Sequence, residues 1–485
     1  MHLPQIRSAQ PDRLFSRRPP PRARNMKRGS QEDGRILMPW ERALDRVLTP
    51  FEEFIHHQTT GGILLLSAAL LALLIANSPL GPAYQHLLHA KLALRFDGWV
   101  LSLSLHHWIN DGLMTFFFFL VGLEIKRELL VGELSDLRQA AMPAIAAVGG
   151  MLVPAGLYML TVHDPLGARG WGIPMATDIA FAVSALVILG RRIPAGLITF
   201  LVALAIVDDL GAVVVIAVFY TENLDLIPLA AAGGLLLLLI VFNLGGIRHP
   251  LPYFLVGVLM WLAMLQSGIH ATIAGVLLAL TIPSRPKYDP QGFLLSIDKL
   301  MDRFRTHDRG DGNILANQRQ FSILQAVEQR AQSAATPLQR MEHALHHPVG
   351  LIVMPLFALA NAGIPLGLGE LHLALGSPIL LGVAAGLVLG KLAGVFLFTW
   401  LAVRLGVGHL PTGTDFRHIV GIGLLAGIGF TMSIFITELA FTGHEQALTF
   451  AKSGILLASL VAGIGGYLWL RFAIPKPAAT TSPTT

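Results

Sequence analysis

The chain has 485 residues, of which 53% are hydrophobic and 13% are charged, and its mean hydropathy is +0.62. Soluble domains carry roughly 25% charged residues, so this composition excludes an ordinary soluble protein and indicates a membrane protein. The net charge of +5 does not indicate nucleic-acid binding, because the basic residues lie between apolar runs, where they fix topology. The chain has no cysteine, which excludes disulfides, thiolate metal sites and thiol catalysis.

The chain begins with a polar segment, residues 1–58, that is rich in arginine and proline and has almost no apolar periodicity. This composition predicts a disordered basic tail on the cytoplasmic side. Its last part, residues 37–55, has the pattern of a short amphipathic helix on the membrane surface. The first apolar run begins after about sixty residues, which is too late for a secretory signal peptide.

Roughly twelve apolar runs follow, separated by charges and by clusters of proline and glycine. They span residues 61–80, 107–123, 140–162, 171–190, 193–220, 226–246, 251–267, 271–282, 350–366, 377–403, 419–436 and 450–470. The sequence therefore predicts an all-α polytopic membrane protein. Its membrane domain has two parts, 59–282 and 349–472, and a short cytoplasmic tail, 473–485, follows.

The charges between the runs predict the orientation in the membrane. With the N-terminus inside, the cytoplasmic connections hold basic residues such as Arg191 and Arg192, whereas the opposite connections hold few cations and more acids. This positive-inside bias predicts that both termini are cytoplasmic.

Two connections differ from short loops. Residues 83–105 end in an alternating pattern around Asp97-Gly98, which predicts an extracytoplasmic β-hairpin. A hairpin is marginally stable alone, so this one is a candidate for pairing with a second copy of the chain. The segment 283–348 is polar, with a helical patch at 314–333, and we interpret it as a cytoplasmic insertion.

Two adjacent aspartates, Asp208 and Asp209, lie near the centre of the apolar run 198–220. An ionised carboxylate costs at least ~2.5–3.5 kcal/mol at that depth, so we interpret both residues as functional. On a helix their side chains diverge by about 100°, so one can face a water-filled cavity while the other meets a counter-charge. Lys391 is the cation that the sequence places deep inside another apolar run, and we expect it to reach one of the two aspartates.

Two of the runs have the pattern of interrupted membrane helices. Pro174 removes a helical hydrogen bond, and Thr177 and Asp178 then resemble the cap and the first turn of a restarting helix. The glycine-rich segment 421–435 is the second candidate, although glycines that only pack helices together would give the same pattern. A pair of interrupted helices in corresponding halves indicates the binding site of a secondary transporter.

Carboxylates, a threonine hydroxyl and freed carbonyls suit a hard cation such as Na⁺ or Li⁺, and the same groups bind protons. If one carboxylate holds either a cation or a proton, but not both, competition alone produces exchange. The residues thus indicate an ion-coupled transporter without a cofactor, with Asp208 and Asp209 as candidate Na⁺ ligands.

Six separated motifs carry a resemblance to a known family. They are INDGLMTFFFFLVGLEIKREL (109–129), PMATDIAFA (174–182), ALAIVDDLGAVVV (203–215), SGIHATIAGV (267–276), LGKLAGV (389–395) and GIGFTMSIF (427–435). Together, and in this order, they closely resemble the bacterial NhaA-type Na⁺/H⁺ antiporters over residues 50–283 and 338–472.

The resemblance implies an inverted-repeat fold of about twelve helices in a bacterial inner membrane, with two broken helices that cross at the midplane. It implies that Asp209 is the main Na⁺ and H⁺ carboxylate and that Asp208 is the partner of Lys391. Asp178 and Thr177 would stabilise the charges where the broken helices cross. By the same resemblance, exchange of Na⁺ or Li⁺ for a larger number of protons is electrogenic and is activated by rising pH.

The resemblance also implies a cytoplasmic cluster that sets the pH response. Its members in this sequence are Glu124, Arg127, Glu128, Arg340, Glu342, His343 and His346, with His270 as a further candidate. The basic tail and most of 283–338 lie outside the family's pattern, and Leu392 stands where the family has a proline after the lysine.

Two other functions also use charged groups in a membrane. An intramembrane aspartyl protease needs its two acids on different helices sharing one proton, whereas Asp208 and Asp209 are adjacent on one helix. A sodium-coupled symporter for an organic anion needs a substrate cavity with more cations at depth than Lys391 alone. The sequence therefore favours an antiporter, a secondary transporter rather than an enzyme.

Overall fold

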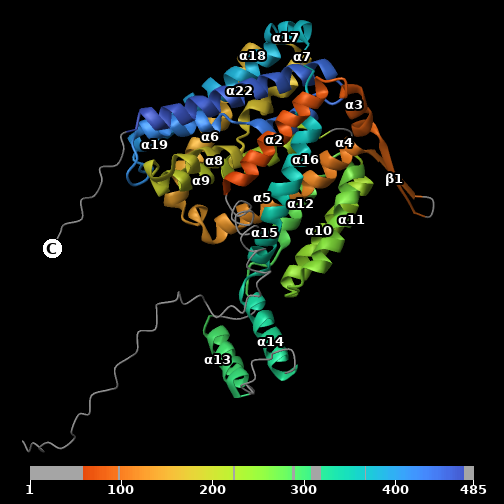
Figure 1. The fold of residues 1–485 in the computed structure, drawn as a ribbon, viewed down its shortest axis with the longest axis vertical. Helices are drawn as coiled ribbons and strands as arrows, with labels where there is room; N and C mark the ends of the chain where they lie inside the picture. The colour runs from red at the N-terminus through yellow and green to blue at the C-terminus, as the bar shows by residue number, and fades with distance from the viewer. Residues whose placement is uncertain are drawn as a thin grey trace, which may run out of the picture. The chain divides into compact units, whose positions relative to one another are not determined.

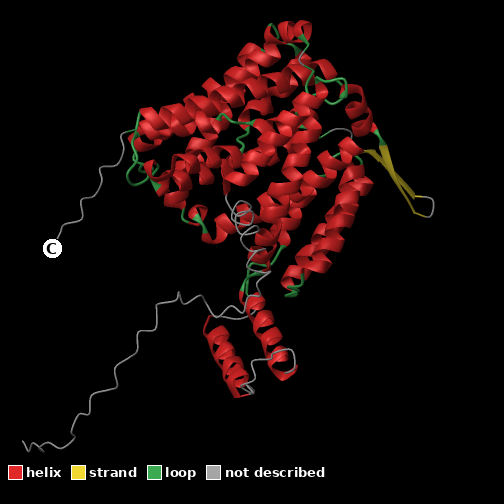
Figure 2. Ribbon diagram, in the orientation of Figure 1, coloured by secondary structure: helices red, strands yellow, loops and turns green. Residues whose placement is uncertain are grey.

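The computed structural model describes residues 58–96, 99–221, 224–286, 290–306, 318–365 and 367–474. The N-terminal tail before residue 58, including the segment 37–55, and the C-terminal tail after residue 474 lie outside these ranges. The described residues are mostly helical and include one two-stranded sheet (Figures 1 and 2). The predicted all-α polytopic fold is confirmed.

The first part of the membrane domain contains the elements from α2 to α12. In chain order they are α2 (Gln58–Ala76), α3 (Gly81–His89), β1 (Lys91–Phe96), β2 (Trp99–Ser104), α4 (Leu105–His107), η1 (Trp108–Leu113), α5 (Met114–Val131), η2 (Glu133–Ser135), α6 (Leu137–Thr161), α7 (Pro165–Ala168), η3 (Arg169–Met175), α8 (Ile179–Leu189), η4 (Gly190–Arg192), α9 (Ala195–Phe219), α10 (Leu226–Leu244), α11 (Pro250–Ser267) and α12 (Ile273–Thr281).

The insertion and the second part of the membrane domain follow. Their elements are α13 (Pro290–Thr306), α14 (Gln318–Ala334), α15 (Pro337–Pro348), η6 (Val349–Val353), α16 (Met354–Asn361), α17 (Leu368–Leu375), α18 (Pro378–Ala385), η7 (Gly386–Gly390), α19 (Lys391–Arg404), α20 (Phe416–Ala426), α21 (Phe430–Ala440) and α22 (Glu445–Phe472).

Membrane spans account for most of these helices. In the described ranges, 9 helices are long and apolar enough to cross a membrane, or up to 11 spans if each of two bent helix pairs counts as one. The predicted run 271–282 forms α12, which has only 9 residues and packs against α5 instead of spanning alone. This short helix explains the difference from the roughly twelve spans that the sequence predicts.

The predicted hairpin is confirmed for its two strands, residues 91–96 and 99–104. Strands β1 and β2 pair antiparallel, from Lys91 opposite Ser104 to Phe96 opposite Trp99. Residues 83–89, which the sequence analysis grouped with the hairpin, belong instead to α3. The end of the membrane domain at which β2 enters α4 is called the hairpin side below.

The insertion contains two helices, α13 and α14, which pack against each other. The predicted helical patch at 314–333 corresponds to α14, whereas α13 was not predicted. The backbone N–H of Leu338 donates to the carbonyl oxygen of Pro283 at 3.2 Å, so the insertion leaves and rejoins the membrane domain at neighbouring residues. That end of the membrane domain is called the insertion side.

Two breaks interrupt the predicted helices where the sequence analysis placed them. Before α8, η3 gives way to residues 176–178, which are not helical, and Asp178 caps α8. The second break separates α20 from α21, whose axes differ by 45°. The helical pieces on both sides of each break leave free amides and carbonyls, which must find partners inside the protein.

Glycines allow the two broken segments and the turn η7 to approach closely. A Cβ atom on Gly427 would lie 2.3 Å from the carbonyl oxygen of Leu387. A Cβ atom on Gly429 would lie 2.2 Å from Ser433 Oγ and 3.1 Å from the carbonyl oxygen of Ala176. No side chain fits at these distances, so the glycines at the second break are required by packing as well as by helix interruption.

Helix α6 holds the two charged helices together. It packs against α19 on one side and against α9 on the other. A Cβ atom on Gly394 would lie 2.1 Å from the carbonyl oxygen of Gly149, so the backbones of α6 and α19 almost touch. The π-helical turn η7 lies directly before Lys391, and such turns often occur at functional sites.

Candidate functional site

Asp208 and Lys391 form a fully buried ion pair at the centre of the membrane domain. Lys391 Nζ donates to Asp208 Oδ2, and both side chains have zero exposure. The hydroxyl of Thr177 lies 2.8 Å from the same carboxylate oxygen and 2.9 Å from the carbonyl oxygen of Ala426. Thr177 therefore connects the ion pair to the carboxyl end of α20, where a free carbonyl needs a partner. The predicted pairing of Lys391 with one aspartate is confirmed, and the partner is Asp208.

Asp209 is equally buried but has different surroundings. Both aspartates are about 1% exposed, and they lie on α9 one residue apart, so their side chains diverge. Among the described residues, Asp209 Oδ1 and Asp208 Oδ1 are buried oxygens without a hydrogen-bond partner. Buried polar atoms in native proteins are normally paired, so each unpaired carboxylate oxygen points to a missing proton, cation or water.

Asp178 joins the two broken helices. Its Oδ1 accepts from the backbone N–H of Phe181 at 3.3 Å, which caps α8. Its Oδ2 accepts from the backbone N–H and the hydroxyl of Thr431, at 3.1 Å and 2.5 Å, at the start of α21. The backbone N–H of Asp178 donates to the carbonyl oxygen of Ile428 at 2.7 Å. One residue thus satisfies free groups of both breaks, and the cap is Asp178 itself, not Thr177 as the sequence analysis expected.

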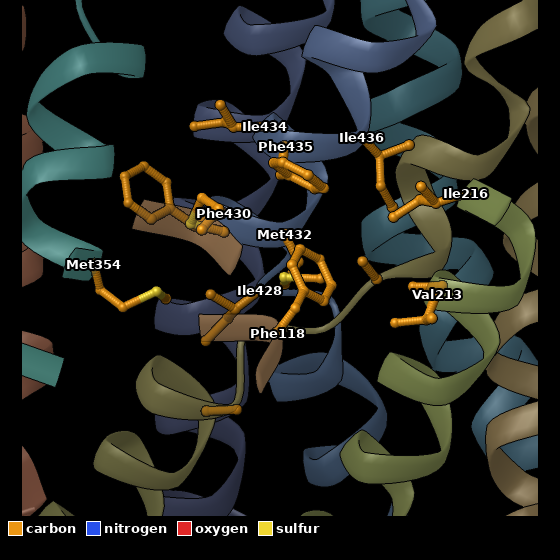
Figure 3. Packing of buried hydrophobic residues seen from close by; sticks show 14 of the residues in the cluster. Phe118, Val213, Ile216, Met354, Ile428, Phe430, Met432, Ile434, Phe435 and Ile436 are labelled. Carbon is orange, nitrogen blue, oxygen red and sulfur yellow. The ribbon is translucent and has the colours of Figure 1, made fainter. Parts of the chain in front are cut away.

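An aromatic layer lies on the hairpin side of the second break. Phe435 of α21 is fully buried, and its ring centroid lies 5.1 Å from that of Phe118 and 6.2 Å from that of Phe357. Figure 3 shows Phe118, Met432 and Phe435 among the buried apolar residues around this break. This layer packs apolar rings against α21, the helix that begins at Thr431 beside Asp178.

Several of the predicted pH-sensing residues come together on the insertion side. Arg127 bridges Glu128 at 2.9 Å and Glu342 at 3.1 Å, and His346 lies 3.9 Å from Glu124. These five residues are called the insertion-side cluster. Arg340 and His343 lie on the same helix, α15, and line a cavity of about 1460 Å³ that Arg127, Glu342 and His346 also border.

The structure does not place His270 in this cluster. Its Nδ1 lies 2.8 Å from the hydroxyl of Thr272, and its Nε2 lies 3.4 Å from Asp111 Oδ1. Its ring also packs on Phe435 at 5.4 Å between centroids. His270 therefore belongs to the wall of the aromatic layer, beside η1.

Several site residues were not predicted from the sequence. The carbonyl groups of Ala426 and Ile428 take part through their backbone, which no side-chain pattern reveals. Lys452 is a second cation that is largely buried, paired with Glu438 at 2.5 Å, so Lys391 is not the only buried lysine. For Glu438, the partner of Lys452, the sequence did offer a signal. It lies seven residues after Thr431, so the two residues share one face of a helix.

The geometry defines a class of protein. Broken membrane helices that meet at buried carboxylates, with free backbone groups pointing inward, are typical of secondary transporters. In the described part of the chain, no group of three or more His, Asp or Glu side chains could hold a metal ion.

Comparison with known proteins identifies the family. The family model "Na+/H+ antiporter 1" matches residues 52–470. The chain is 52% identical over 438 residues to the Na⁺/H⁺ antiporter NhaA of Sulfurimonas denitrificans, covering 90% of this chain and 98% of that protein. It is 51% identical over 432 residues to the Na⁺/H⁺ antiporter NhaA 1 of Saccharophagus degradans, covering 89% and 93%. The chain therefore belongs to the Na⁺/H⁺ antiporter 1 family.

This membership settles several expectations. The predicted resemblance to NhaA-type antiporters is confirmed, and the chain is a multi-pass membrane transporter, not an enzyme. The aspartyl protease and the organic-anion symporter gain no support from these relatives. The bacterial relatives and the apolar helices agree with an inner-membrane location.

Proposed function

We propose that the chain exchanges Na⁺ for H⁺ across the bacterial inner membrane at the meeting point of α8, α9, α20 and α21. The observation that carries this proposal is the unpaired, buried Oδ1 of Asp209, one residue from the Asp208–Lys391 pair. A buried carboxylate without a partner is stabilised by binding either a proton or a cation. Because only one can occupy it at a time, competition couples the two flows.

Asp209 is the residue that carries the exchanged ions in this proposal. Asp208 already has Lys391 and Thr177 as partners, whereas Asp209 has a free oxygen in an apolar environment. A Na⁺ or Li⁺ ion at Asp209 would complete its ligands with oxygens, which hard cations prefer. The second unpaired oxygen, Asp208 Oδ1, is the other candidate ligand.

The Asp208–Lys391 pair positions the site in this proposal. An unpaired lysine or aspartate at this depth would be costly, so the pair keeps both charges in the membrane. Movement of one charge relative to the other during transport would then change the electrostatic potential at Asp209, which is the next residue on α9. Thr177 and Asp178 stabilise the free ends of the broken helices around the pair.

The insertion-side cluster is the proposed control element. Its pairs link α5 to α15, and they include carboxylates, an arginine and histidine. Deprotonation of histidine between about pH 5 and 8 would change these links, which suits activation by rising pH. Exchange of one Na⁺ for a larger number of protons would make the transport electrogenic.

Three further assignments belong to the same proposal. The positive-inside distribution supports cytoplasmic termini and an extracytoplasmic hairpin side. The two-stranded sheet has unpaired strand edges, which supports a homodimer formed through β1 and β2. The hard oxygen ligands of the site also support transport of Li⁺.

A vesicle experiment tests the exchange. Everted membrane vesicles that contain the protein are energised to form a pH gradient, and NaCl or LiCl is then added while a fluorescent amine reports the gradient. We expect either salt to dissipate the gradient in vesicles with the protein and not in vesicles without it. Absence of any response between about pH 6.5 and 9, where histidine-controlled activation would occur, would reject the proposal.

A further inference from the structure

A second buried charged cluster lies on the hairpin side, outside the site described above. Glu438 of α21 pairs with Lys452 of α22 at 2.5 Å, and their side chains are only 13% and 14% exposed. The other carboxylate oxygen, Oε2, lies 3.9 Å from His106 Nε2 of α4. The carboxylate therefore faces a permanent cation on one side and a titratable ring on the other.

Amide groups fix the orientation of His106. Its Nε2 lies 2.9 Å from Asn361 Oδ1 and 3.4 Å from Asn110 Nδ2. Asn361 Nδ2 donates to Asn110 Oδ1 at 2.8 Å and to the carbonyl oxygen of Phe357 at 3.0 Å, so Asn361 Oδ1 is an acceptor. The neutral ring consequently donates from Nε2, and a second proton binds at Nδ1.

Helix α21 links this cluster to the ion site. Thr431, Phe435 and Glu438 lie at i, i+4 and i+7 on one face of α21, so Glu438 is about 10 Å along the helix from Thr431. Thr431 holds Asp178, and Phe435 belongs to the aromatic layer. Glu438 is therefore on the same short helix as two residues that contact the ion site and the aromatic layer.

Few other charges act on His106. The charged or titratable groups that influence it are Glu438, Lys452 and the neighbouring His107 on its own helix. The carboxylate of Asp111 on η1 is close to His270. The groups of η1 and α16 that contact His106 are the neutral amides of Asn110 and Asn361. Helix α3, which packs on α4, carries two histidines that are both exposed.

We propose that His106 and Glu438 form a proton-binding latch on the hairpin side of the transporter. When His106 takes a proton, Glu438 is held by two cations, from α22 and from α4, and α21 is fixed to both. When His106 is neutral, only Lys452 holds Glu438, and α21 is freer to move relative to α4 and η1. Acidification of the hairpin side thus slows the conformational step that α21 takes part in.

The proposal rests on the exchange activity proposed above and adds control by pH at the hairpin side. Protons that compete with Na⁺ at Asp209 raise the apparent KM for Na⁺, because both bind the same carboxylate. The latch acts on a conformational step and lowers the maximal rate. The two effects can therefore be separated in one titration.

The test uses the full-length protein in right-side-out and in everted membrane vesicles, with the lumen buffered near pH 8. Na⁺-dependent exchange is measured over a range of Na⁺ concentrations, with the bath at about pH 8 or about pH 6, values that bracket histidine titration. In the wild type, we expect acid on the hairpin side to lower the maximal rate. In His106→Gln, we expect this fall to be lost while the proton effect on KM remains.

Matched variants separate the latch from a structural role. His86→Gln changes an exposed histidine of α3 that does not act on His106 or Glu438, and it should retain the wild-type fall in maximal rate. Glu438→Gln with Lys452→Met removes both charges of the buried pair together, which avoids an unpaired ion, and should lose the fall as His106→Gln does. A wild-type protein that exchanges Na⁺ in these vesicles, but whose His106→Gln variant shows the same fall in maximal rate, overturns the latch and leaves the antiport proposal standing. Absence of exchange in the wild type overturns antiport itself.

Discussion

The ion pair of Asp208 with Lys391 and the ion pair of Arg127 with Glu342 use similar groups in opposite surroundings. Both side chains of the first pair have zero exposure, whereas Arg127 is 38% and Glu342 is 17% exposed. A buried pair cannot lose one partner without leaving an uncompensated charge, while a partly exposed pair is replaced by water at little cost. The difference teaches that the central pair must keep both charges together, whereas the partly exposed pair tolerates a change in the charge of one partner.

The largest effect is expected at the unpaired carboxylate of the centre. Asp209→Asn keeps the shape of the side chain but cannot alternate between a bound proton and a bound cation. We expect Na⁺-dependent exchange to be abolished in vesicles, with the protein still folded in detergent. Asp298→Asn, on the exposed face of α13, is the control and should exchange normally. Full exchange by Asp209→Asn would move the transport site elsewhere.

The next largest effect concerns the buried cation. Lys391→Ala leaves Asp208 buried and without its cation, so we expect a loss of about 3–5 kcal/mol in unfolding free energy. Thermal unfolding of the purified variant measures the loss. Lys391→Arg should recover part of the stability, because it restores a positive charge. Unchanged unfolding of Lys391→Ala would mean that Asp208 is neutral in the resting protein and that the comparison between the two pairs fails.

A smaller effect is expected at the insertion side. Glu342→Gln removes a negative charge beside Arg127 in the insertion-side cluster, and a negative charge favours the protonated form of the groups around it. If deprotonation activates transport, the activation midpoint should move to lower pH. A partly exposed pair contributes about 0–1 kcal/mol, which corresponds to a shift of less than about one pH unit. The pH profile of exchange measures it, with Glu133→Gln as an exposed control. A shift of the activation midpoint toward higher pH would contradict this prediction.

The smallest effect is expected from the insertion. Because Pro283 and Leu338 are hydrogen-bonded neighbours, residues 284–336 can be replaced by a short glycine linker without separating α12 from α15. We expect exchange to persist, with at most a small change of the pH profile that is transmitted through α15. Loss of transport in a folded deletion variant would show that the insertion is part of the transport mechanism. A large change of the profile would extend the control region from the insertion-side cluster to α13 and α14.

The sequence predicts the centre better than its surroundings. Asp208, Asp209 and Lys391 were identified because ionisable groups in apolar runs are costly, and Pro174 marked the first break. The carbonyls of Ala426 and Ile428 were not identified, since every residue carries such a group and only the fold decides which are free. The π-helical turn before Lys391 likewise has no sequence signal of its own.

The charged cluster on the hairpin side shows another limit. Glu438 and Lys452 lie near the ends of their helices, where charged residues are ordinary, so their burial could not be predicted from their position. His106 lies between the connection 83–105 and the predicted apolar run 107–123, so the sequence pattern assigns it to neither. Only the packing of α4, α16, α21 and α22 turns these three residues into neighbours.

The reciprocal capping by Asp178 has a consequence for biosynthesis. The ribosome delivers Asp178 and Thr431 to the membrane 253 residues apart. Until α20 and α21 are made, Asp178 Oδ2 and the backbone N–H of Asp178 lack their later partners, Thr431 and Ile428, and hydrocarbon offers no substitute. The first part of the chain must therefore remain hydrated or bound to a chaperone until the second part is inserted. Truncation before residue 431 should leave a chain that the cell's quality-control proteases recognise.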